Sequence, residues 1–184
     1  MSIKTYNWVP FFSHTGSEIC DLIDDLKHEP VAIITNNNKV EKLDLRLLKY
    51  NIYFLPTRPT AKDYLDMLEF LNDIHGDELK ITLHGFMRII PDEVLEIYKM
   101  VNLHPGLITK YPQLKGKDPQ KKAFDLKLES SGAVIHEVTN DLDGGEILIV
   151  SDEINIKNLE LDVVYNKIKE QSLVIWKQHF EEIG

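Results

Sequence analysis

The chain has 184 residues, 43% of them hydrophobic and 28% charged, a balance that suits a single globular domain over residues 1–184 with a buried core. Its formal net charge of −9 opposes general binding to nucleic acids or to anionic membranes, since both partners would repel it. No apolar run reaches the ~18 residues of a membrane span, the first residues lack a signal-peptide core, and the single cysteine fits a reducing compartment, so we expect a cytoplasmic protein.

Strands and helices alternate along the first half of the chain. Tyr6–Ser13 is apolar and aromatic and predicts a strand, and the spacing of Thr15 and Glu18 is that of a capping box that starts a helix ending near Lys27. The next predicted elements are a strand over Val31–Thr35, a helix over Val40–Tyr50, a strand over Ile52–Leu55, a helix over Thr60–His75 and a strand over Leu79–Leu83.

The same alternation continues in the second half. The predicted elements are a helix over Pro91–Tyr98, a strand over Met100–Leu103, a loop over 105–118, a helix to about Leu128, strands over Ala133–Val138 and Ile147–Val150, and a helix from about Leu159 to Glu182. This order predicts an α/β fold, a doubly wound, mainly parallel sheet with helices on both faces. The late pair of strands could add an antiparallel element. Ligands of such folds bind beyond the carboxyl ends of the strands.

Asn102 and His104 stand two residues apart at the end of a predicted strand. A period of two puts both side chains on one face. The Asn102 amide can donate to a developing oxyanion, and the His104 imidazole can exchange a proton near neutral pH. Pro105 and Gly106 then turn the chain away and leave both groups at a rim. The ordinary alternative is that Asn102 satisfies a turn and His104 is a surface or core histidine.

The segment Asn140–Gly145 combines acidic residues with two adjacent glycines. A carboxylate in it could pair with His104 and favour the charged imidazole. Adjacent glycines adopt backbone conformations that other residues reach only at a cost, and they let a ligand approach the main chain. A tight turn with a cap explains the same residues without a function. A calcium loop is disfavoured because further ligands and a distal glutamate in register are missing, and we expect no metal.

A third segment, His84–Pro91, follows the predicted strand over Leu79–Leu83. Its apolar side chains and backbone groups could line a slot for a flat aromatic ligand. An ordinary strand end, with Phe86 and Met87 in the core, is the alternative.

Together, the order and spacing of the three segments resemble the folate-dependent formyltransferases, and most closely the glycinamide ribonucleotide formyltransferase family. The similarity is strongest over Gly85–Ile147, in the motifs GFMRII, NLHPG, YPQLKGKDPQKKAF and SGAVIHEVTNDLDGGEILI. The remainder of the chain fits in length and in element order.

The resemblance implies the formyltransferase fold, with 10-formyltetrahydrofolate as the formyl donor and a place in one-carbon and purine or nucleotide metabolism. It implies that Asn102, His104 and Asp143 form the catalytic trio. It also implies a set of residues beside the folate pterin ring, which are Phe86, Met87, Arg88, Ile90, Asn140 and Asp141.

The acceptor side departs from the family pattern. Gly16 and Ser17 match the loop that holds the substrate phosphate at a helix N-terminus, but Glu18 replaces an asparagine, and a carboxylate repels phosphate. His84 replaces a small residue. Glu170 lies near the position of an acceptor-binding glutamate. Other departures are Gly106 and Thr109.

We therefore predict formyl transfer to the amine of a small, phosphorylated acceptor, which could be glycinamide ribonucleotide, an amino-sugar nucleotide or a modified nucleotide. The partners would be this amine and folate, and a homodimer is allowed. Lysines between Lys110 and Lys122 could hold an acceptor phosphate or the folate tail, or could simply be solvated. The alternatives are a formyltetrahydrofolate hydrolase and a non-catalytic folate- or nucleotide-binding protein.

Overall fold

A computed structural model of the protein describes residues 6–76 and 78–183. Backbone contacts divide the chain into two compact units, the first ending at Val101 and the second running from Asn102 to Ile183. Strand β5 (Met100–His104) carries the chain from one unit to the other. The single domain expected from the sequence stays a prediction.

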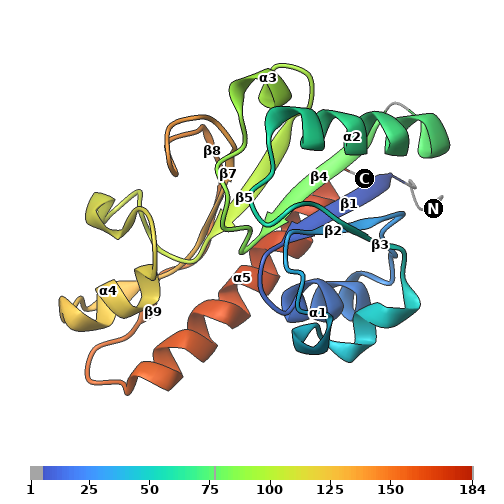
Figure 1. Ribbon diagram of the computed structural model, residues 1–184. Coiled ribbons are helices and arrows are strands. Elements are labelled where there is room, and N and C mark those ends of the chain that lie inside the picture. The colour runs from blue at the N-terminus through green and yellow to red at the C-terminus, as the bar shows by residue number, and fades with distance from the viewer. Residues whose placement is uncertain (1–5, 77, 184) are drawn as a thin grey trace. The chain divides into compact units, whose positions relative to one another are not determined.

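The first unit is built on a parallel sheet. Its strands follow the order β3-β2-β1-β4, and every adjacent pair is parallel. Helices α1 and α2 cover opposite faces of these strands (Figure 1), as the doubly wound prediction requires. The elements are β1 (Asn7–Phe12), α1 (Ser17–Leu26), β2 (Ile33–Thr35), β3 (Ile52–Phe54), α2 (Ala61–His75), β4 (Leu79–His84) and α3 (Asp92–Leu95).

Sequence explains the best-defined elements of this unit. Strand β1 carries Trp8, Phe11 and Phe12, all fully buried, since a parallel strand is covered on both faces. Helix α2 begins with a capping box in which Thr60 and Asp63 satisfy each other's backbone N–H groups. It ends at Gly76, whose φ of 92° favours glycine.

The helix predicted over Val40–Tyr50 is wrong. The segment forms two short 3₁₀ turns, η1 (Val40–Lys42) and η2 (Leu45–Lys49). Leu43 and Asp44 between them are extended, and the Asp44 side chain caps the second turn. Aspartate hydrogen-bonds nearby backbone readily, and this competes with a continuous helix.

The capping box predicted at the start of α1 is also wrong. The helix begins at Ser17 with Gly16 as its N-cap residue, at φ 75°, and no side chain caps it. Thr15 accepts the Ser17 N–H at 3.3 Å. The Glu18 carboxylate instead contacts the ring of His84, and this competing partner lies far away in the sequence.

Side chains beyond the carboxyl ends of three strands are joined in the first unit. Ser13 follows β1 and donates its hydroxyl to Asn36, which follows β2, at 2.7 Å. The same hydroxyl accepts the backbone N–H of Met87, beyond β4, at 2.7 Å. This is the edge at which doubly wound sheets bind ligands.

The second unit contains an antiparallel pair, as predicted. Strands β7 and β8 pair with a bulge between Ile135 and His136, and two short strands absent from the prediction, β6 and β9, pair separately. The predicted helix to Leu128 ends earlier. The elements are η3 (Pro112–Leu114), α4 (Pro119–Asp125), β6 (Ser130–Ser131), β7 (Val134–Glu137), β8 (Ile147–Val150), β9 (Ile154–Asn155) and α5 (Leu161–Ile183).

One apolar cluster holds this unit together. It brings side chains of α5, β7 and α4 onto the loop after β5 and includes Leu107, Leu114, Ala123, Val134, Val164 and Ile168. Leu114 is fully buried in it. Because its side chain is packed, the backbone of the loop over 105–118 is fixed at that point.

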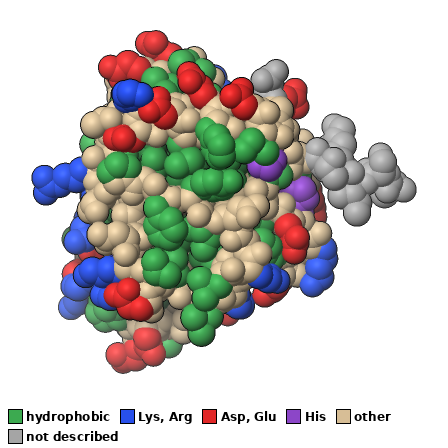
Figure 2. All heavy atoms as spheres, turned by 45° about the vertical axis from the view of Figure 1, so that its right-hand side comes forward, with side chains coloured by type: hydrophobic (Ala, Val, Ile, Leu, Met, Phe, Trp, Pro, Cys, Tyr) green, Lys and Arg blue, Asp and Glu red, His purple; other side chains and the backbone are tan. Residues whose placement is uncertain are grey.

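Several large apolar side chains of the first unit reach solvent, among them Leu48, Phe54, Phe70 and Ile74. Figure 2 shows apolar side chains gathered on one face, with acidic side chains near its borders. Such a surface fits self-association, and the homodimer stays a prediction. Within the described residues, we find no helix of the length and apolarity needed to span a membrane.

Candidate active site

Three of the predicted site residues come together in the second unit. His104, at the end of β5, points Nδ1 at Asp143 Oδ2, 3.2 Å away. Asn102 lies two residues earlier on the same strand, and its Nδ2 is 3.2 Å from Nε2 of His136. Nε2 of His136 is in turn 3.5 Å from the second Asp143 oxygen. The predicted meeting of amide, imidazole and carboxylate is thus observed, with a second imidazole between Asn102 and Asp143.

Both ring nitrogens of His104 face acceptors. Nε2 lies 2.9 Å from the backbone carbonyl of Leu114, and a carbonyl can only accept, so Nε2 carries a proton. Nδ1 faces the Asp143 carboxylate, which stabilises a proton there as well. The ring is almost fully buried. In this geometry both ring nitrogens of His104 are placed to donate hydrogen bonds.

Asp143 is held as a carboxylate. Burial alone would raise the pKa of its carboxyl group, but the contact with the ring of His104 and the hydrogen bond from the Gly116 N–H outweigh burial and hold that pKa well below its ordinary value. The Gly116 N–H donates to Oδ2 at 2.7 Å. The loop over 105–118 therefore contacts both His104, through the Leu114 carbonyl, and Asp143, through the Gly116 N–H.

This lowered pKa predicts a pH dependence of stability. A carboxyl group whose pKa is lower in the folded state than its ordinary 3.8 contributes stability above that value, and the contribution is lost as the pH falls below it. We expect the difference in unfolding free energy between the native chain and Asp143→Asn to be constant above about pH 5 and to shrink toward about pH 2. Urea unfolding of both proteins across this range measures it, and a gap that does not change with pH would contradict the assignment.

The turn after β7 places Asp143. Asn140 and Asp141 are exposed, and the Asp141 carbonyl accepts the Thr139 hydroxyl at 3.2 Å and the Gly144 N–H at 2.9 Å. Asp143 itself takes a left-handed backbone, with φ 50°, which aspartate tolerates better than most residues. The segment is thus a tight turn, and it also delivers a carboxylate to His104.

The two glycines of this turn make room for the chain's own groups, and the approach of a ligand that they suggested stays a prediction. Neither Gly144 nor Gly145 has a left-handed φ. A Cβ on Gly145 would overlap the Glu137 carbonyl, and one on Gly144 would overlap the Asp141 side chain. The close approach of the chain's own groups therefore requires both glycines.

The stretch that resembles the pterin-binding segment is divided between core and surface. Phe86 and Ile90 are buried, and Phe86 packs edge-on against Phe11 at 5.4 Å. Met87 and Arg88 are exposed. The slot predicted here can offer a ligand these two side chains and the backbone, whereas the phenylalanine belongs to the core.

Glu18 and His84, two departures from the family pattern, contact each other. Glu18 Oε1 lies 2.7 Å from His84 Nδ1, and His84 Nε2 lies 2.7 Å from the Thr82 hydroxyl, which also accepts the Trp8 indole N–H at 2.8 Å. The His84 side chain is almost fully buried, while Glu18 is partly exposed. The two residues are therefore partners, and the Glu18 carboxyl group lies at the start of α1.

The remaining predicted residues are less constrained. Glu170 lies on the exposed side of α5. Within the lysine-rich segment, Lys110 pairs with Glu153, Lys121 pairs with Asp125, and Lys122 donates to a backbone carbonyl. These partners reduce the charge available to an anionic ligand.

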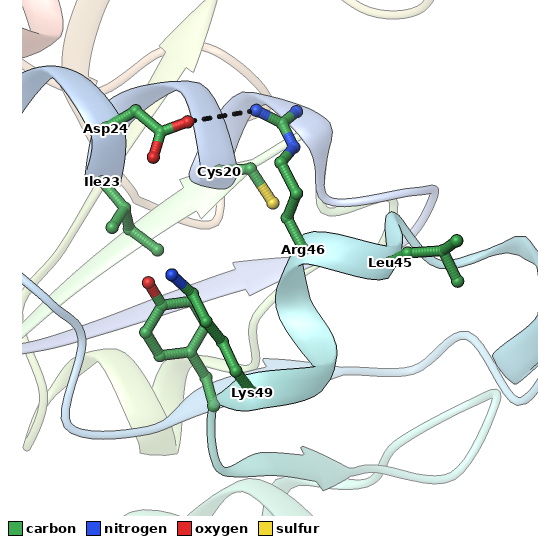
Figure 3. A pocket seen from close by; sticks show the side chains of 7 residues that line it. Cys20, Ile23, Asp24, Leu45, Arg46 and Lys49 are labelled. Atoms are coloured by element: carbon green, nitrogen blue, oxygen red, sulfur yellow. Dashed lines mark hydrogen bonds and ion pairs between the residues drawn. The ribbon is translucent and has the colours of Figure 1, made fainter.

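A cavity of about 200 Å³ in the first unit contains none of the predicted residues. Figure 3 shows its lining, which is Cys20, Ile23, Asp24, Leu45, Arg46, Lys49 and Tyr50. It is smaller than the ~300 Å³ of typical ligand pockets. Arg46 is paired with three aspartates, so its charge is already compensated. In the described ranges 6–76 and 78–183, no three His, Cys, Asp or Glu residues are grouped as metal ligands would be.

His136 is the residue of this site that the sequence motifs did not predict. It lies within an apolar strand, where a buried histidine is easily taken for core. One pattern could have revealed it. His136 follows the buried Val134 by two residues on the same strand face, and a polar side chain at such a buried position needs hydrogen-bond partners.

Comparisons with known proteins agree with this geometry. The formyl transferase family model matches residues 7–176. The human trifunctional purine biosynthetic protein adenosine-3 is 32% identical over 151 residues, which cover 74% of this chain but only 14% of that protein. Formyltetrahydrofolate deformylase 2 of Arabidopsis thaliana is 33% identical over 98 residues, or 52% of this chain and 28% of the relative.

A solved structure confirms the predicted fold class. The phosphoribosylglycinamide formyltransferase of Campylobacter jejuni superposes with a TM-score of 0.84 at 22% identity, over 99% of each chain. With the family match across nearly the whole sequence, these findings confirm the resemblance first seen in the motifs. The chain belongs to the formyl transferase family.

Proposed function

We propose that the chain transfers a formyl group from 10-formyltetrahydrofolate to the amine of a small acceptor. The observation that carries the proposal is the His104 ring held between Asp143 and the Leu114 carbonyl, with the Asn102 amide on the same strand. Two such donors suit a carbonyl carbon that gains negative charge on its oxygen as a nucleophile attacks. Relatives named for purine biosynthesis and formyl transfer support it.

Each residue has a distinct part in the proposed reaction. As the acceptor nitrogen attacks the formyl carbon, Asn102 and His104 donate hydrogen bonds to the formyl oxygen. His104 Nε2–H is the donor free to exchange, because a developing oxyanion competes for it better than the neutral carbonyl of Leu114. Asp143 keeps the ring charged and takes part in moving a proton from the attacking amine to the departing folate nitrogen. The N–C bond to the acceptor forms and the bond to folate breaks.

On the donor side, we propose that Phe86, Met87, Arg88 and Ile90 form the pterin-binding segment together with the turn at Asn140 and Asp141. The exposed Met87 and Arg88 would supply side-chain contacts, and the buried residues would fix the backbone. The acceptor would be held by Gly16, Ser17 and Glu18, with Glu170 on α5.

The Glu18–His84 pair supports an acceptor other than glycinamide ribonucleotide. A carboxylate at the start of α1 repels a phosphate at that helix end. Glu18→Asn alone leaves the buried His84 without its carboxylate, so we expect Glu18→Asn combined with His84→Ala to use glycinamide ribonucleotide more efficiently than the native chain, by about 10-fold or more in kcat/KM. Steady-state rates with that substrate measure the change. If the double variant folds and gains nothing, Glu18 does not determine acceptor choice.

Formyltetrahydrofolate hydrolysis is the second candidate, and the similarity to a formyltetrahydrofolate deformylase favours it. The same trio could assist attack by water. Release of tetrahydrofolate, followed by its ultraviolet difference band with and without a panel of amines, separates the two activities. Transfer predicts release that depends on an amine, whereas equal release without any amine would identify a hydrolase. Binding of a folate analogue with no release under either condition would indicate a binding protein.

A further inference from the structure

His136 lies between two members of the trio and has a fixed proton. It is 3% exposed, on β7, and its Nδ1 lies 2.7 Å from the carbonyl oxygen of Glu137. A carbonyl can only accept a hydrogen bond, so Nδ1 bears the proton. The same carbonyl is the group that requires a glycine at position 145, so its location is fixed by the turn.

The position of this proton decides what the other nitrogen does. In the neutral ring, Nε2 carries a lone pair, and Asn102 Nδ2 lies 3.2 Å away as its donor. That bond engages one amide hydrogen of Asn102 and sets which end of the amide faces the ring. The other amide hydrogen and the side-chain oxygen stay available to a substrate.

We propose that His136 is a positioning residue that orients the Asn102 amide as an oxyanion donor, an inference that rests on the proposed formyl transfer. Without an acceptor at Nε2, the Asn102 amide can rotate by half a turn and present its oxygen where its N–H should be. An oxygen facing the developing oxyanion repels it. His136 touches no reacting atom and acts through Asn102.

The Asp143 carboxylate competes for the same nitrogen. Its Oδ1 is 3.5 Å from Nε2, longer than the contact with Asn102. The shorter contact, with Asn102, is therefore the one through which His136 can position the amide.

Two variants of His136 separate positioning from packing. His136→Gln places an amide oxygen close to the position of Nε2 and keeps an acceptor for Asn102, whereas His136→Leu fills similar space without one. We expect His136→Leu to lower kcat by about 10- to 100-fold, the range seen when an orienting partner is lost, with little change in KM for the formyl donor. His136→Gln should recover most of kcat. His179→Gln, at a buried histidine of α5 in the same unit, is the matched control and should leave kcat unchanged.

A double-mutant cycle supplies the decisive comparison. If His136 acts through Asn102, adding His136→Leu to Asn102→Ala should change kcat by less than about threefold, because the group that it orients is already absent. An equal loss in both backgrounds, or a glutamine variant no better than leucine, would overturn the inference. A native-like kcat for Asn102→Ala would instead refute the proposed chemistry. If the leucine variant does not fold, His136→Asn, whose amide is too short to reach Asn102, replaces it with the same expectations.

Discussion

His104→Ala is expected to lower formyl transfer by about 10²–10⁴-fold, because it removes an oxyanion donor and the partner of Asp143, the group proposed to move the proton. Binding of a folate analogue should change only a few-fold, since no predicted pterin contact involves this ring. Tetrahydrofolate release measures the first quantity and calorimetric titration the second. The loss should appear in kcat rather than in KM for the donor.

The control for this variant is a histidine outside the site. His28→Ala, in the first unit, removes a partly buried ring that contacts the Tyr6 carbonyl, and it should leave kcat unchanged. Retention of most transfer activity by His104→Ala, with the control also active, would show that the imidazole between Asp143 and Leu114 does not act on the substrate.

Asp143→Asn should reduce transfer by a comparable factor, about 10²–10⁴-fold, for a different reason. The amide oxygen of asparagine can still accept the Gly116 N–H, so the turn and the loop should stay in place. The negative charge beside His104 is lost, however, and the ring is no longer held as an imidazolium. The variant should therefore fold, bind folate and transfer slowly, and tetrahydrofolate release measures the loss.

Asp125→Asn is the matched control for that change. Asp125 is exposed and paired with Lys121, so removing its charge should leave the rate unchanged. If Asp143→Asn retains the native rate, the proposed proton path fails.

The parts of the site that local sequence rules describe were predictable. Asn102 and His104 share a strand face because strands have a period of two. Both lie toward the carboxyl end of β5, the edge at which such sheets bind ligands. The antiparallel pair of β7 and β8 and the capped start of α2 also follow from local patterns.

Contacts between residues far apart in the sequence were not predictable in the same way. The capping box predicted at Glu18 does not form, because His84, 66 residues away, offers the carboxylate a buried partner. The contact between the Leu114 carbonyl and His104 depends on a loop that the buried Leu114 side chain holds in place. A contact made by a backbone group cannot be recognised from a sequence motif. His136 was missed since its neighbours in the strand are apolar and its partners are distant.

The glycines of the turn have a packing role that the sequence did not indicate. Adjacent glycines predicted an unusual backbone or an approaching ligand. The structure instead shows Gly145 against the Glu137 carbonyl, with the left-handed backbone at Asp143. Sequence identifies such a position as special, but only the packing shows which neighbour makes it so.

The most direct test follows a carbon-labelled formyl group from 10-formyltetrahydrofolate in the native chain and in Asn102→Ala, His104→Ala and Asp143→Asn. The account predicts that the native chain moves the label into an N-formyl amine with one tetrahydrofolate released for each product, and that each variant loses this transfer while still binding folate. Label found only in formate, or transfer that survives in all three variants, would contradict it.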